Sequence, residues 1–304
     1  MSDKIAFIPI NFLSVYMYNK LFMFYSSVLF MTIAICIKVN DGIVLATDSA
    51  STLSSKNGVI KVYENADKLA NLYKGLPVGI ITWGAGSIGS ASTATLIKDF
   101  RKRVMGLIED QDKWSINKTE YSIQEIATKF KEFIFDDIYM KYYSEQQDFV
   151  QGFLIAGYSA NSDMAEAWKI QIVKDNCFGP EPVMDNEKCG INWFGKTEAV
   201  VRLVFGIDPM LESVLRKNEI REEKIHRIIK SVTNSWSTDL ISDPMPILDA
   251  VDLGKFLVEL TKGYFRFKPG AAIVGGPTEI AAITKHEGFK WITRKLYYDR
   301  ELNL

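Results

Sequence analysis

The sequence contains very little histidine and cysteine. His226 and His286 are the only histidines in 304 residues, so a histidine-based triad or a multi-histidine metal site has little to draw on. The three cysteines, Cys36, Cys177 and Cys189, show no C-x-x-C spacing, which argues against a disulfide framework and against a zinc site. Their scatter fits a reducing compartment, so we expect a cytoplasmic protein that needs no metal and no cofactor.

An excess of charge of one sign is also lacking. Lysine and arginine number 36 and aspartate and glutamate 37, a formal net charge of -1, which disfavours nucleic acid as a partner. The chain is 47% hydrophobic and 24% charged, so it can bury one large core or two modest ones. No repeat, low-complexity tract or clear domain boundary interrupts it, and we predict a single domain over residues 31–304.

The first thirty residues form an apolar leader of uncertain purpose. An uncharged run from Leu21 to Ile37 reaches the lower limit of roughly 17 residues for a membrane helix. Residues 33–39, however, alternate as a β-strand does, and an Asn-Asp-Gly turn leads into a second strand. We therefore disfavour a membrane span and predict that synthesis starts at Met31, with residues 1–30 a misassigned start. A targeting or membrane-anchoring leader is the alternative.

The rest of the chain alternates between patterns typical of strands and of helices. Hairpin-like connections between strands favour antiparallel sheets with helices outside them over a parallel βαβ series. We predict strands near residues 33–39, 43–48, 59–62, 68–72, 76–83, 150–158, 165–173, 191–194, 271–274, 279–284 and 289–292, and helices near 87–108, 123–143, 197–205, 221–236 and 247–262.

Three segments together resemble the amino half of a proteasome β-type subunit, including its HslV-like bacterial relatives, in the N-terminal nucleophile hydrolase superfamily. They are Met31-Thr32 with the hairpin ending LATDSAST, ADKL at 66–69, and GIITWGAG at 79–86. The likeness covers about residues 31–100. It implies an α+β fold, a four-layer αββα sandwich of two antiparallel sheets flanked by helices.

The resemblance also implies a catalytic group. Thr32 matches the nucleophile, Asp48 the acid that ends the second strand, and Lys68 the lysine of a later strand. A threonine hydroxyl needs a base, and an α-amino group, with a pKa near 7.7 to 8.0, is attached to the same residue when threonine comes first. Lys68 would lower the pKa of this amine, and Asp48 would hold Lys68. Thr32 must then be the first residue of the mature chain.

The segment GAGSIG at 84–89 has three interpretations. It is formally a G-x-G-x-x-G, but the polar stretch after the following helix offers no second parallel strand for a dinucleotide fold. It can also be a plain turn between a strand and a helix. In the resemblance, the backbone N–H of Gly84 stabilises the oxyanion, and Ser51 and Thr52 bind the substrate as an added strand.

The carboxyl half departs from the family pattern. Where active members carry supporting polar residues, this chain has Gly195 with Lys196, and Ala271 with Val274, although a Gly-Gly pair follows at 275–276. The main prediction is a threonine-type peptidase or amide hydrolase acting on peptide or protein substrates. The resemblance further implies a homo-oligomeric ring and an ATPase unfoldase partner. The alternative is a non-catalytic structural or interaction subunit that keeps the fold.

Overall fold

The computed structural model describes residues 32–55, 58–108, 112–143, 148–185, 187–296, 298–299 and 301. The predicted leader, residues 1–30, and the predicted start at Met31 lie outside these residues. The described end of the possible membrane span, Ile33 to Ile37, is part of a β-strand. Among the described residues, no helix combines the length and apolar character needed to cross a bilayer.

The first of two five-stranded sheets contains the start of the described chain. Its strand order is β12-β1-β2-β13-β14, and every pair of neighbours is antiparallel. The alternating β-branched residues of β1 and β2 are buried along their whole length, as expected for a central hairpin covered on both faces. The strands are β1 Ile33–Val39, β2 Gly42–Thr47, β12 Gly190–Gly195, β13 Glu279–Thr284 and β14 Gly288–Thr293.

The second sheet has the order β11-β10-β9-β6-β5, again with antiparallel neighbours. Two small hairpins, β3–β4 and β7–β8, lie outside the large sheets. The strands are β5 Leu69–Asn71, β6 Val78–Gly84, β9 Val150–Tyr158, β10 Ala165–Val173 and β11 Asn176–Pro182, with β3 Ser51–Ser55, β4 Gly58–Tyr63, β7 Ser87–Ile88 and β8 Ala91–Ser92 in the hairpins.

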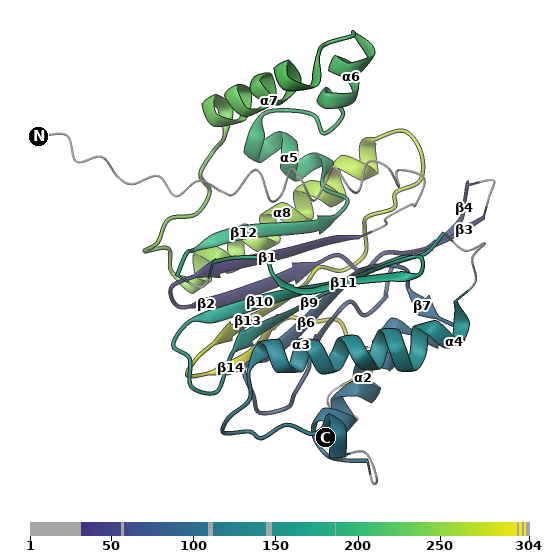
Figure 1. Ribbon diagram of the computed structural model, residues 1–304, viewed down its shortest axis with the longest axis vertical. Helices are drawn as coiled ribbons and strands as arrows, with labels where there is room; N and C mark the ends of the chain where they lie inside the picture. The colour runs from purple at the N-terminus through teal and green to yellow at the C-terminus, as the bar shows by residue number, and fades with distance from the viewer. Residues whose placement is uncertain are drawn as a thin grey trace, which may run out of the picture.

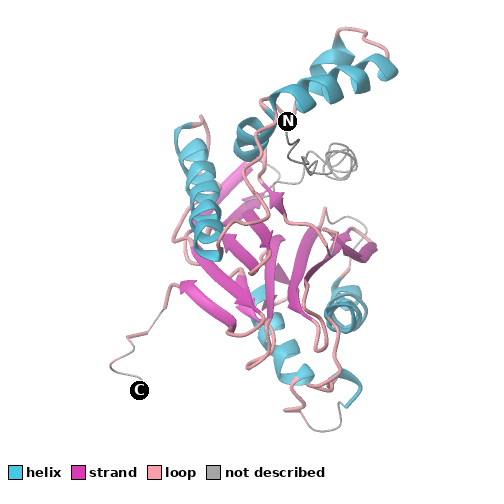
Figure 2. Cartoon of the chain, turned by 90° about the vertical axis from the view of Figure 1, so that its left-hand side faces the viewer, coloured by secondary structure: helices cyan, strands magenta, loops and turns pink. Residues whose placement is uncertain are grey.

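Helices cover the outer side of each sheet (Figure 1; Figure 2). α8 packs on β1 and β2, and α3 packs on β9 and β10. Two helices begin at serine caps: Ser92 accepts from the Thr95 amide at 3.1 Å, and Ser122 from the Glu125 amide at 3.0 Å. The helices are α2 Thr93–Val104, η1 Asp112–Trp114, α3 Ile123–Lys131, the π-helical η2 Glu132–Tyr139, α4 Met140–Tyr142, α5 Glu198–Phe205, α6 Leu211–Lys217, α7 Glu222–Trp236 and α8 Ile247–Phe267.

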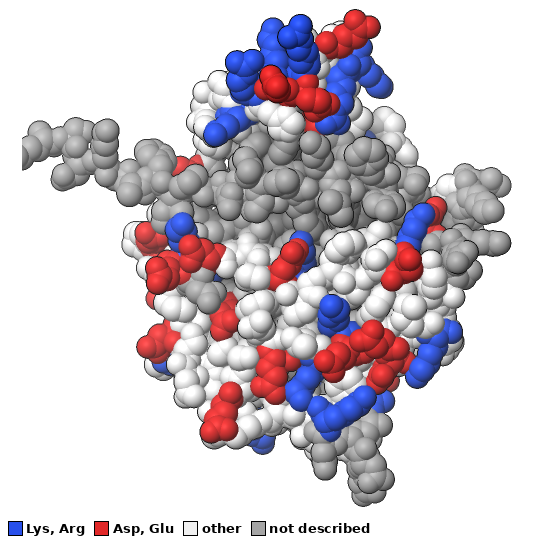
Figure 3. Space-filling view, in the orientation of Figure 1, with Lys and Arg blue, Asp and Glu red and all other residues white. Residues whose placement is uncertain are grey.

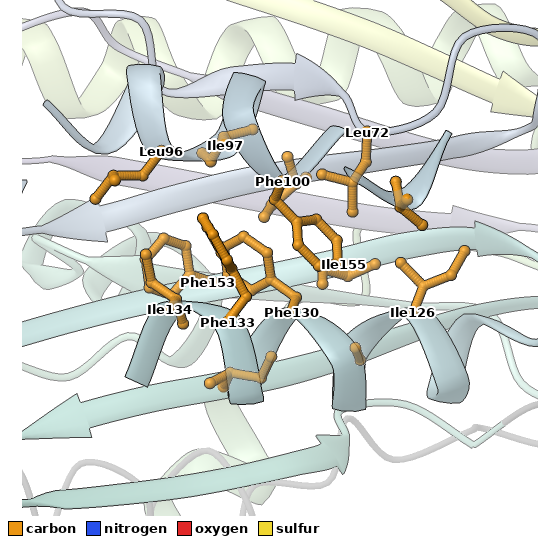
Figure 4. Packing of buried hydrophobic residues seen from close by; sticks show 14 of the residues in the cluster. Leu72, Leu96, Ile97, Phe100, Ile126, Phe130, Phe133, Ile134, Phe153 and Ile155 are labelled. Atoms are coloured by element: carbon orange, nitrogen blue, oxygen red, sulfur yellow. The ribbon is translucent and has the colours of Figure 1, made fainter. Parts of the chain in front are cut away.

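Three apolar clusters hold these elements together. One joins the inner faces of the two sheets, where the rings of Trp83 and Phe194 stack at 4.3 Å. A second joins β1, β2 and β13 to α5 and α8. In the third, Phe100 of α2 meets Phe130 of α3 edge-to-face at 5.1 Å, and Phe130 packs on Phe153 of β9 (Figure 4). Each aromatic ring removes a large apolar area from water, so these contacts are a main source of stability.

The structure confirms antiparallel sheets with helices, and it corrects several predicted elements. The helix expected from residue 87 begins at Thr93, because residues 87–92 form the β7–β8 hairpin. The strand expected at 271–274 is a loop. β11 and α6 were not expected, since β11 has few β-branched residues and the seven residues of α6 give no clear period.

Charged side chains of both signs are interspersed over the face shown in Figure 3, including the region of α6 and α7 at its top. This mixture agrees with the near-zero net charge of the sequence.

Candidate active site

Thr32 is held by its backbone immediately before β1. The residue is 3% exposed, and its carbonyl oxygen accepts a hydrogen bond from the Lys196 amide at 2.7 Å. Gly195 has a φ of +86°, and a Cβ atom at this position would clash with the Thr32 carbonyl oxygen. The end of β12 can therefore approach Thr32 only because residue 195 is glycine.

Asp48 lies immediately after β2 and is fully buried. Its Oδ1 accepts from the Lys68 ammonium at 2.8 Å and from the Ile33 amide at 3.1 Å. Its Oδ2 accepts from the amides of Ala50 and Gly275, both at 3.1 Å. Each carboxylate oxygen thus accepts two hydrogen bonds, so the buried carboxylate has protein donors in place of water.

Lys68 lies immediately before β5 and is 6% exposed. Burial lowers the pKa of its ammonium below the ordinary value of 10.5, and the ion pair with Asp48 opposes this shift. The nearby Lys295 lowers this pKa further, and Glu279 raises it. The Lys68 carbonyl accepts from the Thr82 amide at 2.9 Å, which fixes the backbone of the lysine to β6.

A single carboxylate oxygen joins the three predicted residues. Asp48 Oδ1 contacts both the Lys68 ammonium and the amide nitrogen that links Ile33 to Thr32. The start of β1, the end of β2 and the start of β5 therefore meet at one buried point. The sequence placed these residues far apart, and the fold brings their backbones and charges together.

Gly84 ends β6 with a φ of +102°. A Cβ atom here would clash with the Val150 carbonyl oxygen, which accepts from the Ala85 amide at 3.0 Å. Packing against β9 is thus sufficient to require glycine, whatever else the Gly84 amide does. The predicted oxyanion role stays a prediction.

Ser51 and Thr52 begin β3, close to the segment that follows Gly84. The Ser51 hydroxyl lies 3.2 Å from the position a Cβ of Gly86 would occupy. The Thr52 hydroxyl is buried and has no hydrogen-bond partner among the described residues. A buried hydroxyl without a partner is costly, so it is suited to accept or donate a bond to a ligand.

The loop at 271–278 supports the site through its backbone. Ala271 is exposed and Val274 is a buried apolar residue, so neither brings a polar side chain to Asp48. Gly275 instead donates its amide to Asp48 and accepts from the Ser49 amide at 3.0 Å. These backbone contacts do not themselves require glycine at 275, where a Cβ would meet nothing within 4 Å; Gly276, with a φ of +72° and the Glu64 carbonyl oxygen in the way of a Cβ, does require it.

No motif points to Lys295, which follows β14. Its ammonium donates to Ser49 Oγ at 2.9 Å and to the Ala66 carbonyl at 2.8 Å, and it pairs with Glu279 at 2.6 Å. Ser49 follows Asp48, and Ala66 lies two residues before Lys68. Lys295 therefore ties together the two segments that carry the central ion pair. Because it is 246 residues from Ser49, no local pattern could have revealed it.

No protein-family model matches the chain, and no curated protein does. Among solved structures, the helical assembly of the Anbu complex from Pseudomonas aeruginosa matches with a TM-score of 0.48 and 13% identity, over 88% of each chain. A Gly-1 mutant of Anbu from Hyphomicrobium sp. strain MC1 matches at 0.49 and 13%, and Anbu from the same strain at 0.46 and 12%, each over 89% of this chain and 91% of the other.

These findings correct the predicted relationship. The resemblance to proteasome β-type and HslV-like subunits was wrong as an assignment, because no family model and no curated protein supports it and the structural matches are to Anbu. Segments that short can share a pattern of strand, acid, lysine and glycine without a closer relationship. The comparisons assign no family to this chain.

Proposed function

We propose that the chain is an amide hydrolase in which Thr32, freed as the first residue of a processed chain, is the nucleophile. The observation that carries the proposal is the oxygen of Asp48 shared by the Lys68 ammonium and the Ile33 amide. A buried lysine with a lowered pKa beside the start of a chain is a suitable neighbour for a catalytic amine.

In this mechanism the Thr32 hydroxyl attacks the carbonyl carbon of an amide, and its proton passes to the α-amino group of the same residue. Charge on Lys68 disfavours a second positive charge nearby, which keeps the amine neutral and basic. Asp48 holds Lys68 in place, and the Gly84 amide donates to the oxyanion.

The second half of the reaction reverses the proton transfer. The ammonium gives its proton to the leaving nitrogen as the C–N bond breaks, and an ester on Thr32 remains. Water then attacks this ester and returns the hydroxyl to Thr32. The α-amine accepts the water proton and passes it to the Thr32 oxygen as the ester C–O bond breaks and the acyl group leaves as a carboxylic acid, so the cycle needs no metal and no cofactor. Ser51 and Thr52, beside the segment after Gly84, would contact the substrate backbone.

The proposal includes a four-layer arrangement of the sheets and helices. We assign the elements to four layers in the order α, β, β, α, with α5 and α8 on one side and α2 and α3 on the other. Support comes from the three separate apolar clusters, one between the sheets and one under each pair of helices. In this arrangement the site lies at one end of the sheets, where β1, β2 and β5 meet.

The test has two steps. Intact-mass measurement of the purified protein should give a chain that begins at Thr32. The Thr32→Ala variant should then lose at least about 10³-fold of the activity of the wild type on a panel of fluorogenic peptide amides, since the nucleophile is gone. Thr32→Ser should keep part of it. Thr293→Ala, an exposed threonine of β14, is the matched control and should change nothing. Full activity of Thr32→Ala would refute the mechanism.

A second candidate is a non-catalytic protein that keeps the fold. The observation that favours it is the lack of polar side chains at Ala271 and Val274 near the ion pair. It predicts that the residues before Thr32 remain attached, so the same intact-mass measurement separates the two. Self-association is a prediction for either candidate, and the native mass in solution tests it.

A further inference from the structure

A cavity of about 450 Å³ lies between α2, β5 and the end of β14. Four basic side chains line it from three separate segments, Lys74 from the β5–β6 loop, Lys98 and Arg101 from α2, and Arg294 from the end of β14. The acidic side chains that line it are Asp67 and Glu279. Its volume is within the range of small-molecule sites, roughly 300 to 1,000 Å³.

Both acids of the cavity already have cationic partners. Asp67 pairs with Lys98 at 3.5 Å and with Lys295 at 3.5 Å, and Glu279 pairs with Lys295 at 2.6 Å. Lys295 is itself 12% exposed and directed toward Ser49. The ion pairs of both acids are therefore with lysines, although the charge of Arg294 also acts on Glu279 from a greater distance and lowers its pKa.

Arg101 and Arg294 are held in place by contacts other than ion pairs. Arg101 donates to the Asn71 carbonyl at 3.2 Å, and the Arg294 guanidinium lies over the Trp291 ring at 4.8 Å. Within the described part of the chain, neither forms an ion pair with a carboxylate. Burial, and then the charge of Arg294, lower the pKa of Arg101, which indicates that the two guanidinium groups repel each other.

Two guanidinium groups facing one cavity match the geometry of an oxyanion. Each presents a planar fork of N–H donors that binds carboxylate or phosphate oxygens in pairs, and an anion between them would remove the repulsion. Beside them the wall is apolar, with Ile97, Phe289 and Trp291. Such a wall suits the organic body of a small molecule rather than a free ion alone.

We propose that this cavity is a binding site for a small organic anion whose phosphate or carboxylate group is clamped by Arg101 and Arg294. Thr32 does not line this cavity, and the proposal does not depend on hydrolase activity. Phosphate esters and polycarboxylates share the required chemistry, and the choice of probes distinguishes them.

Calorimetric titration at low ionic strength tests the proposal, with inorganic pyrophosphate and phenyl phosphate as phosphate probes and citrate as the carboxylate probe. We expect at least one probe to bind the wild type. Arg101→Gln and Arg294→Gln should each weaken its binding by about tenfold or more, and the double variant should abolish it. Arg101→Lys should bind more weakly than the wild type because it keeps the charge and loses the fork. Arg227→Gln, on the exposed face of α7, is the matched control and should bind normally.

Folding and assembly are checked on the same samples. Arg294 is exposed, so Arg294→Gln should keep the thermal midpoint of the wild type and remain informative if Arg101→Gln does not fold. Equal binding by wild type and the Arg294→Gln variant would overturn the proposal, as would failure of all three probes to bind the wild type. A lower native mass of Arg294→Gln without probe binding would also overturn it, since the arginines would then pair with a second copy of the chain.

Discussion

Replacing Asp48 by asparagine tests the centre of the candidate site. Asp48 accepts four hydrogen bonds on two oxygens, whereas asparagine has one acceptor oxygen and would turn its NH₂ group toward two donors. The change also leaves the Lys68 ammonium buried without its partner. Removing one member of a buried ion pair costs about 3 to 5 kcal/mol, so we expect Asp48→Asn to lower the free energy of unfolding by this amount.

The pH dependence of the same variant gives a second readout. The pKa of Lys68 in the folded protein is below its ordinary value of 10.5. In the pH interval between these two pKa values, the unfolded chain binds more protons than the folded one, so the free energy of unfolding rises with pH. Loss of Asp48, which raises this pKa in the wild type, should move the start of the interval to lower pH. The stability of Asp48→Asn should therefore rise more between pH 7 and 10 than that of the wild type.

Urea unfolding followed by circular dichroism at several pH values measures both effects. The control is the double variant Asp48→Leu with Lys68→Met, which removes both charges and should therefore lack the steep pH dependence. If Asp48→Asn lowers the free energy of unfolding by less than about 1 kcal/mol and shows the same pH dependence as the wild type, the site does not depend on the buried ion pair.

Two further substitutions test the surroundings of the pair. Gly195→Ala should destabilise the protein by about 1 to 3 kcal/mol in urea unfolding, because φ is +86° and the new Cβ would clash with the Thr32 carbonyl oxygen. The control is Gly263→Ala in α8, where a Cβ meets nothing within 4 Å, and it should be neutral or stabilising. Equal effects of the two substitutions would contradict this account. Lys295→Met should lower the free energy of unfolding by about 3 kcal/mol at pH 7, because it leaves the buried Glu279 carboxylate without its ion-pair partner. The loss should be smaller at pH 5, since burial raises the pKa of Glu279 and a protonated Glu279 carries no charge. The same loss at both pH values would exclude Glu279 as the cause.

Local pattern was sufficient for most of the elements. The alternation of β-branched residues and the Asn-Asp-Gly turn predicted the β1–β2 hairpin, and the predicted bounds of β9 and β10 agree with the structure. Local pattern failed where an element is too short to show a period, as in β7 and β8. It also assigned a strand to 271–274, a segment that the fold uses as a loop.

Long-range contacts account for what the sequence could not reveal in the site. Gly275 donates to Asp48 across 227 residues, and Lys295 reaches Ser49 across 246. An acid at the end of a strand and a lysine before another are visible in the sequence, but their ion pair depends on how two sheets are packed. The cavity near Arg101 has the same origin, since α2 and the end of β14 meet only in the folded chain.

The energetic cost of the Asp48–Lys68 pair bears on why the fold contains it. A buried ion pair contributes little net stability, and apolar residues of similar volume often do as well or better. If Asp48→Leu with Lys68→Met proves as stable as the wild type, the fold does not need these charges, and a chemical role is the remaining reason to bury them beside Thr32. If that double variant instead unfolds as readily as Asp48→Asn, the carboxylate is required as the acceptor for Ile33, Ala50 and Gly275, and the case for catalysis has to rest on Thr32 alone.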